Sequence, residues 1–325
     1  MKKLLIILLL SVVFIPFAHA GDSKPIEMKL GHFAADAHEG NLASKMFAEA
    51  VEKRTNGAIK ITIYPNNALG APPEVLEQNI LGAVDMSLPT QGQLGKYSKK
   101  FNCVMLPFVF NDYAQADKVL DGPFLKWAAP DLDKAGLVFL SNWEWGFRNL
   151  TNSKHPVNVP ADVKGLKIRT IQTPTYVAAL NAMGANATPM AFGEVYTAMQ
   201  TGVLDGFEHG SAVIKAQKFY EVSKYIALTQ HLFGPLVFAY SKKEWAGLTD
   251  KEKAVIMDGA KMARDVQRTL GPLREQEAFD FLKTKGMVIN KIDTSGFRKN
   301  AVAVQDKFAK EVGASDLLEI IRATN

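Results

Sequence analysis

The chain is centred on two segments, GLKIRT at residues 165–170 and GANATPMAFGEVYTAMQTGVLDGFEHG at residues 184–210. The first segment predicts a short strand whose last positions include the cation Arg169. The second predicts a helix, a glycine that ends it, and a strand that leads to Glu208 and His209. Ligands of open α/β sheets bind at the carboxyl ends of strands. Both strand ends therefore point to half of an anion-binding site.

The N-terminus has the pattern of a secretory signal peptide. Lys2 and Lys3 precede an apolar run over residues 4–10, and the small-x-small triplet at 18–20 offers a cleavage site. The apolar run is too short to span a membrane. We therefore predict that residues 1–20 are removed on export, with a retained N-terminal anchor as the alternative.

Composition narrows the class of protein. Removing residues 1–20 from the 325-residue chain leaves 305 residues, enough for two domains, and loss of Lys2 and Lys3 lowers the net charge from +5 to +3. Cys103 is the single cysteine, so an internal disulfide and a lipid on a new N-terminal cysteine are excluded. Lysine and arginine are scattered among acids, which argues against a nucleic-acid partner.

Strand-like and helix-like patterns alternate along the chain. Period-two or short apolar runs predict strands at 26–33, 59–63, 84–88, 137–141, 166–170, 203–207, 225–228 and 236–240. Helical spacing predicts helices between them, at 42–51, 74–81, 113–120, 124–135, 174–183, 194–201 and 212–219. This alternation predicts an α/β fold with a mostly parallel sheet covered on both faces.

A very long helical pattern begins at the capping box Thr249–Glu252 and continues towards Lys285. Gly271 and Pro272 interrupt it, and proline inside a helix removes a hydrogen bond and causes a kink. We expect two helical arms that meet at Gly271 and cross between two lobes.

One internal similarity suggests related lobes. Residues 74–85 and 194–205 both read Glu-Val, six residues, glycine, two residues and aspartate. If the similarity is structural, the loops at 89–91 and 208–210 face each other across a cleft. The alternative is that both segments are ordinary helix-to-strand connections, in which a glycine ends the helix.

Motifs for catalysis are missing. The chain has no Gly-x-Ser-x-Gly elbow, no phosphate loop and no paired cysteines. His38-Glu39 begins like a zinc-protease helix, but Leu42 stands where the second histidine is needed. We therefore predict neither a metal nor another cofactor, and no reaction can be named.

A binding cleft accounts better for two arginines near strand ends, Arg148 and Arg169. A guanidinium in a dry cleft pairs a carboxylate with charge-assisted hydrogen bonds. An internal acid such as Asp162 or Glu194 is the alternative partner. Aromatic residues near them are candidates for walls of the cleft or for ordinary core positions, namely Trp145, Phe192, Phe207 and Phe233.

The two central segments resemble the substrate-binding proteins of TRAP (tripartite ATP-independent periplasmic) transporters. The similarity is densest at 165–169 and 189–208, and it extends to shorter motifs at 64–70, 146–153 and 218–225. It covers nearly the whole mature chain. It implies a periplasmic, monomeric, non-enzymatic protein that closes on an organic acid and delivers it to the membrane permease subunits of the transporter.

The resemblance also implies a two-lobed periplasmic-binding-protein fold. One lobe is expected to comprise residues 21–145 with 234–272, and the other 146–233 with 273–325. The flexing elements are expected where the chain crosses between lobes, near Trp145, Phe233 and Gly271-Pro272.

The substrate-binding residues follow partly from the resemblance. The family arginine that grips the carboxylate falls on Arg169, the second arginine on Arg148 and the aromatic residue on Phe192. His209 stands where relatives usually have asparagine, and Phe207 where they have glutamine, which departs from the family pattern. With first-lobe positions added, the predicted site comprises Arg169, Arg148, His209, Phe192, Trp145, Thr90, Gln91, Gln172, His38, Glu39 and Phe33.

The residue types around this site favour a sugar acid of the uronate or aldonate type. Aromatic rings cover the C–H faces of a sugar, and His209 and Glu144 offer polar groups that read hydroxyls. Two arginines also permit a C4-dicarboxylate, and aromatic acids remain a further alternative. The alternative from another class is an exported enzyme that acts on sugar acids.

Overall fold

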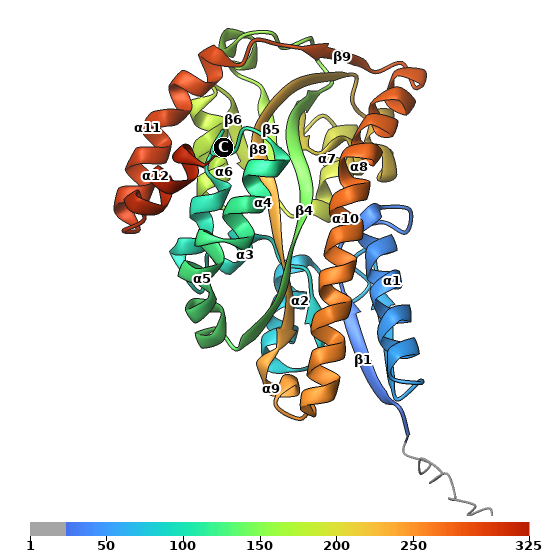
Figure 1. Cartoon of the computed structure of the whole chain (residues 1–325). Helices are drawn as coiled ribbons and strands as arrows, with labels where there is room; N and C mark the ends of the chain where they lie inside the picture. Colours follow the sequence, from blue (N-terminus) through green and yellow to red (C-terminus); the bar gives the residue numbers. More distant parts are fainter. Residues whose placement is uncertain (1–23, 325) are drawn as a thin grey trace, which may run out of the picture.

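Strands from both halves of the chain join one mixed sheet in the computed structural model, which describes residues 24–324. The strand order is β2-β1-β3-β8-β4-β7-β5-β6, and β9 pairs with β8. Figure 1 shows this sheet running along the molecule with helices on both faces. The predicted signal peptide, residues 1–20, lies outside the described residues.

The first half of the chain forms the strands and helices that the sequence pattern predicts, together with two short helices, α3 and η1, that it did not predict. They are β1 Ile26–Gly31, α1 Glu39–Arg54, β2 Ile59–Tyr64, α2 Pro72–Leu81, β3 Met86–Ser87, α3 Gln91–Leu94, η1 Lys99–Met105, α4 Tyr113–Asp121 and α5 Pro123–Lys134. β1 pairs in parallel with both β2 and β3. The loops that follow β1 and β3 therefore lie at the same edge of the sheet.

The second half repeats the alternation with shorter elements. They are η2 Pro160–Val163, β5 Lys167–Thr170, α6 Pro174–Ala182, β6 Asn186–Pro189, η3 Phe192–Glu194, α7 Val195–Gln200, β7 Gly206–His209, α8 Ser211–Ala216 and η4 Phe219–Glu221. β5 pairs in parallel with β6 and β7. Arg169 and Phe207 are direct neighbours across that pairing.

Two long antiparallel strands connect the lobes: β4, Leu137–Asn152, and β8, Tyr225–Ser241. The sequence predicted only a short strand at 137–141 and two separate strands at 225–228 and 236–240, so both predictions were too short. β4 is irregular between Glu144 and Phe147, where Gly146 adopts a φ of 72°. The ladder resumes on either side of this irregularity, which keeps one continuous sheet through both lobes.

The last third of the chain crosses back over the sheet. It contains α9 Lys242–Trp245, α10 Asp250–Thr284, β9 Val288–Lys291, α11 Ser295–Glu311 and α12 Ser315–Ala323. α11 and α12 contact α5, α6 and η1, elements that lie on both sides of the predicted lobe boundaries. Those boundaries stay a prediction.

α10 is a single helix of 35 residues that contains Pro272. Its predicted capping box is confirmed, because Thr249 N donates to Glu252 Oε2 at 2.7 Å and Glu252 N donates to Thr249 Oγ1 at 3.3 Å. The two predicted arms thus form one element, held against the sheet by hydrogen bonds between Gln267 and the backbone of Glu144. A kink at Gly271 stays a prediction.

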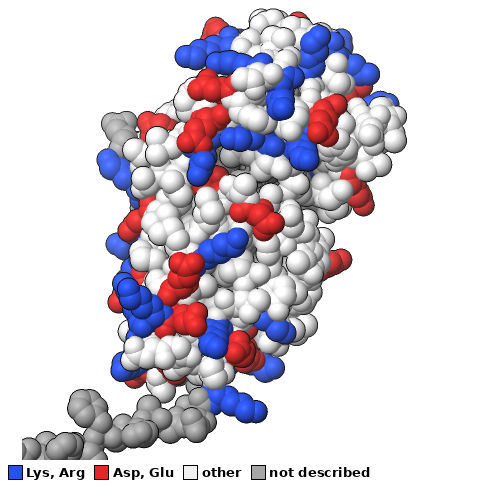
Figure 2. All heavy atoms as spheres, turned by 90° about the vertical axis from the view of Figure 1, so that its right-hand side faces the viewer, with Lys and Arg blue, Asp and Glu red and all other residues white. Residues whose placement is uncertain are grey.

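Lysine and arginine side chains alternate with acidic ones over the face formed by α1 and α10 (Figure 2). Within residues 24–324, none of the helices is both long enough and apolar enough to cross a membrane.

Candidate ligand-binding site

The site lies where β4, β7 and β5 are neighbours in the sheet. β4 carries Arg148, β7 carries Glu208 and His209, and β5 carries Arg169. All four side chains are buried, with 3% or less of their surface exposed. Three strands therefore bring two cations, one carboxylate and one imidazole into a water-poor region.

Arg169 is a buried cation whose hydrogen bonds go to a neutral group. Its Nε and Nη2 both donate to the carbonyl oxygen of Met190, at 3.0 and 2.7 Å, and its Nη1 is buried without a partner. The guanidinium carbon lies 5.7 Å from the centre of the Phe192 ring. Burial lowers the pKa of Arg169 to about 9. A guanidinium in this state can still donate through Nη1 to an anion.

Arg148, in contrast, has an internal carboxylate. Its Nε and Nη2 donate to the two carboxylate oxygens of Glu208, and Nη2 also donates to the Glu208 carbonyl at 2.9 Å. Thr170 Oγ1 donates to Glu208 Oε1 at 2.8 Å. Burial alone would lower the pKa of Arg148, but the adjacent Glu208 carboxylate outweighs it and raises that pKa. The internal acid is thus Glu208 rather than Asp162 or Glu194.

His209 is a neutral hydrogen-bond donor at this position. Its Nδ1 accepts from the backbone N–H of Gly210 at 2.9 Å, so the neutral ring carries its hydrogen on Nε2. Burial, together with the charges of Arg148 and Arg169, holds the pKa of His209 well below its usual value. The Nε2–H group of His209 can thus donate one hydrogen bond, as an N–H of the asparagine expected at this position from the resemblance could.

Aromatic rings from both lobes meet above these groups. Phe33, which follows β1, lies 4.7 Å from Trp145, 5.3 Å from Phe192 and 6.2 Å from His209, measured between ring centres. Phe192 lies 5.5 Å from His209, and His38 lies 4.9 Å from Trp145. We call these five rings the aromatic cluster. Its members come from segments that the predicted boundaries assign to different lobes, and their rings are in contact.

Two of the aromatic residues that the sequence suggested for the cleft belong to the core. Phe207 packs on Phe219 with ring centres 4.5 Å apart, and Phe233 packs on Phe147 at 5.0 Å. Both are almost fully buried. Alternation along β7 puts Phe207 on the same face as His209, and the contact with Phe219 is what places its ring in the core.

The remaining first-lobe positions have mixed placements. His38 caps α1, because its Nδ1 accepts from Gly40 N at 3.1 Å, and Glu39 beside it is also buried. Thr90 caps α3 by accepting from Gln93 N at 3.2 Å. Gln91 is fully buried, and its Oε1 lacks a partner.

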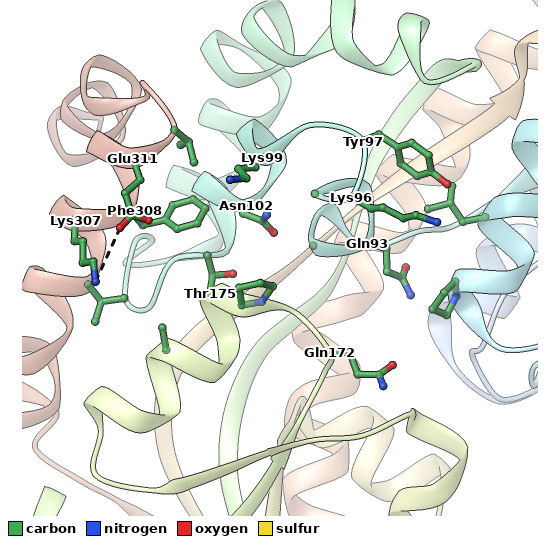
Figure 3. A pocket seen from close by; sticks show the side chains of 18 of the residues that line it. Gln93, Lys96, Tyr97, Lys99, Asn102, Gln172, Thr175, Lys307, Phe308 and Glu311 are labelled. Carbon is green, nitrogen blue, oxygen red and sulfur yellow. Dashed lines mark ion pairs between the residues drawn. The ribbon is translucent and has the colours of Figure 1, made fainter.

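Gln172 lies apart from the aromatic cluster. It is exposed and lines a groove of about 850 Å³ between α3, η1, α6 and α11 (Figure 3). Arg169, Phe192 and His209 do not line this groove. Of the predicted site residues, this groove therefore contains Gln172 but not the buried cation Arg169.

Glu144, proposed as a polar group of the site, lies instead against α10. A Cβ atom added at Gly271 would be 3.3 Å from Glu144 Oε1, and both carboxylate oxygens are buried without hydrogen-bond partners. Burial raises the pKa of Glu144 to about 8. Glu144 thus belongs to the seam between β4 and α10 rather than to the aromatic cluster.

The sequence did not identify Glu208 as the partner of Arg148, although it placed Glu208 at the end of a strand. It also missed His32 and Asn67, polar residues beside Phe33. The signal for His32 was its position directly before Phe33 at the end of a strand. Within the part of the chain that the structure describes, no three histidine, cysteine, aspartate or glutamate side chains are grouped to hold a metal ion.

Two lobes joined by crossing strands, with the buried cation Arg169 on one of them, are an arrangement suited to binding a small solute. The chain belongs to the family described as bacterial extracellular solute-binding protein, family 7, whose model matches residues 30–311. The resemblance to TRAP substrate-binding proteins is thereby confirmed.

Individual relatives agree with this assignment. The 2,3-diketo-L-gulonate-binding periplasmic protein of Escherichia coli is 34% identical over 298 residues, which is 90% of each chain. A TRAP periplasmic solute-binding protein from Sulfitobacter, solved with β-D-galacturonate, superposes with a TM-score of 0.88 at 32% identity and covers 91% of this chain and 99% of its own. The sugar-acid-binding protein of Advenella mimigardefordensis, solved with galactonate, gives 0.89 at 31% identity, with 94% and 100% covered.

Proposed function

We propose that this protein captures a sugar acid in the periplasm and delivers it to the membrane permease of a TRAP transporter. The observation that carries the proposal is the state of Arg169, a buried guanidinium with a free Nη1 and no internal carboxylate bonded to it. An uncompensated charge in the interior is costly unless an opposite charge joins it. The carboxylate of the ligand supplies that charge.

The count of charges favours an acid with one carboxylate. Glu208 neutralises Arg148, so Arg169 is the one cation of this pair that is left for the ligand. The aromatic cluster offers faces that cover sugar C–H groups, and His209 Nε2 offers a donor for a hydroxyl. The relatives named above bind 2,3-diketo-L-gulonate, β-D-galacturonate and galactonate, which are all hydroxylated acids with one carboxylate. A C4-dicarboxylate would leave its second charge without a cation here.

Binding and release follow from the contact between lobes. The rings of Phe33 in the first lobe and Phe192 in the second are in contact, with centres 5.3 Å apart, so a ligand bound beside them contacts both lobes only when they are closed. A ligand shifts a conformational equilibrium by its preference for one state. The closed, loaded monomer is the form that the permease recognises, and the protein itself transforms nothing.

The test is a binding screen with a matched arginine control. D-Glucuronate, D-galacturonate, galactonate, D-erythronate and succinate are titrated calorimetrically into the wild type, Arg169→Met and Arg54→Met. We expect at least one sugar acid to bind the wild type and Arg54→Met equally, and to bind Arg169→Met about 100-fold or more weakly, because a desolvated charge pair is lost. Arg54 is exposed at the end of α1, so its variant controls for the change in net charge.

Equal affinity of Arg169→Met and wild type for the best acid would contradict the proposal. Tighter binding of succinate than of every sugar acid would contradict the choice of ligand class. Incubation of the best acid with the wild type, followed by NMR, separates binding from catalysis. A new product in that spectrum would favour the enzyme alternative.

A further inference from the structure

A small cavity in the first part of the chain, mostly apolar in its lining but bordered by three polar residues, is not used by the binding of a carboxylate. It lies beside the ends of β1 and β3, has a volume of about 10 Å³, and is lined by His32, Phe33, Asn67 and Ser87 together with apolar neighbours. A volume of 10–15 Å³ is about what one water-sized group needs. The cavity is therefore large enough for a hydroxyl and too small for a carboxylate or an amide.

Polar atoms at this cavity lack partners. His32 is 5% exposed, and neither of its ring nitrogens has a partner in good hydrogen-bond geometry, although the Asn41 side chain lies near enough to raise its pKa. The Oδ1 atom of Asn67 is likewise buried and unpartnered. Ser87, by contrast, is satisfied, because its hydroxyl donates to Asn79 Oδ1 at 2.8 Å. Buried polar groups without partners are uncommon, and each costs about 1–3 kcal/mol when it stays unpaired.

His32 is neutral at physiological pH. Burial lowers its pKa to about 3, with a further lowering from His38 and Lys45, while the Asn41 side chain acts in the opposite direction. A neutral imidazole has one N–H donor and one acceptor nitrogen. With Asn67 Oδ1 as a second acceptor, the cavity matches a group that both donates and accepts. A hydroxyl has these properties, whereas an ionised carboxylate only accepts.

The cavity borders the cleft between the lobes. Phe33 lines it and also contacts Phe192 and His209 of the second lobe. The loop that carries Asn67 reaches the second lobe directly, because Gln217 Nε2 donates to Asn66 Oδ1 at 3.3 Å. Arg169 stands in the second lobe and His32 in the first. An acid that spans the closed cleft can thus present its carboxylate to one and its hydroxyl-bearing part to the other.

We infer that His32 and Asn67 form a hydroxyl subsite, which reads one hydroxyl group of the bound acid and rejects a second carboxylate. The inference rests on the proposed function, since it takes the ligand carboxylate to be at Arg169. It adds that selection for hydroxylated acids is made in the first lobe, by residues outside the predicted site.

Two variants test the subsite, with one control. His32→Leu removes both ring nitrogens at similar size, and Asn67→Gly removes Oδ1 without backbone strain, because Asn67 has a φ of 60°. Asn56→Gly is the matched control, since Asn56 has a φ of 51° and is exposed in a turn after α1. The probes are D-glucuronate, D-galacturonate, galactonate and D-erythronate, with the monodeoxy analogues of whichever binds the wild type most tightly.

We expect both variants to bind that acid about tenfold or more weakly, and Asn56→Gly to bind it as the wild type does. One monodeoxy analogue should bind the wild type weakly, yet lose little further affinity in His32→Leu, because the same contact is already absent. Unchanged affinity in both folded variants, or an equal penalty for every deoxy analogue in the wild type and His32→Leu, would overturn the subsite alone. Failure of all four acids to bind the wild type, or unchanged binding by Arg169→Met, would overturn the proposed function and this inference with it.

Discussion

Arg148 on β4 and Arg169 on β5 lie on either side of β7. Arg148 is hydrogen-bonded to a carboxylate of the protein, whereas Arg169 is not. Glu208, on β7 between those strands, bonds Arg148 through both carboxylate oxygens, while Arg169 bonds the Met190 carbonyl. A charge that is paired inside the protein contributes to the fold, and one that is unpaired is available to a ligand. The same residue type thus has two roles, which are set by its neighbours.

The pairing of Arg148 predicts a large cost for Glu208→Gln. The amide keeps the shape of the side chain but leaves the Arg148 cation uncompensated in the interior, which costs about 3–5 kcal/mol of the free energy of unfolding. Urea unfolding of the ligand-free protein measures this loss. A loss below about 1 kcal/mol would show that Arg148 does not depend on Glu208.

Arg169 could be predicted from the sequence and Glu208 could not, for a physical reason. The segment that ends at Arg169 is local, so its apolar run and its terminal cation can be read directly. The Arg148–Glu208 pair joins residues 60 positions apart and depends on the antiparallel register of β4 with β7. That register is set by the assembled sheet. The burial of His32 could not be predicted either, because it depends on how residues far apart in the sequence pack in the folded protein.

At the scale of elements, the seam between β4 and α10 contains carboxyl groups that the fold keeps from water. Glu144 on β4 has a pKa raised to about 8 by burial, and Glu275 on α10 and Glu39 on α1 each have one raised to about 7. The charged groups near Glu144 are Asp117, Arg268, Glu39 and Glu275. Each raised pKa means that the folded state binds a proton more tightly than the unfolded chain does.

This seam predicts a dependence of stability on pH. A carboxyl whose pKa rises on folding stabilises the protein fully below its unfolded pKa, near 4.5, and that stability is lost as pH rises through the folded value, about 8 for Glu144. The free energy of unfolding should therefore fall less between pH 5 and pH 8.5 in Glu144→Gln than in the wild type. The difference in that fall should be on the order of 4 kcal/mol. Parallel urea unfolding curves of both proteins over this range measure it. Identical slopes would contradict the burial of an ionisable group at this position.

The long elements were the hardest to predict. β4 and β8 carry buried polar residues such as Glu144, Arg148 and His231, which break the apolar pattern that marks a strand. Gly234 and Pro235 further divide β8, although the strand continues opposite the irregular part of β4. Three short strands, β1, β2 and β5, have apolar interiors and were predicted close to their observed bounds, whereas β7 was predicted three residues early and β6 and β9 were not predicted. The functional residues therefore obscured the strands that position them.

In the whole molecule, the lobes are connected by the strands β4 and β8 and by the helix α10. α10 contacts α1 of the first lobe and α8 of the second, and Ser211 Oγ donates to the Glu275 carbonyl at 3.2 Å. The cleft itself is closed by side chains, with Phe33 against Phe192 and Asn66 bonded to Gln217.

The fold class and the two-lobed plan were predictable from the alternation of strands and helices and from the family motifs. The closed contacts were not, because they join residues on different lobes.

The pairing of the ligand carboxylate with Arg169 is tested by comparing an acid with its own amide. The sugar acid that binds the wild type most tightly and the corresponding primary amide differ in charge at one group and in little else. Calorimetric titration should show the amide binding about 100-fold or more weakly to the wild type, and this difference should largely vanish in Arg169→Met. Equal affinity of the wild type for the acid and the amide would contradict the account.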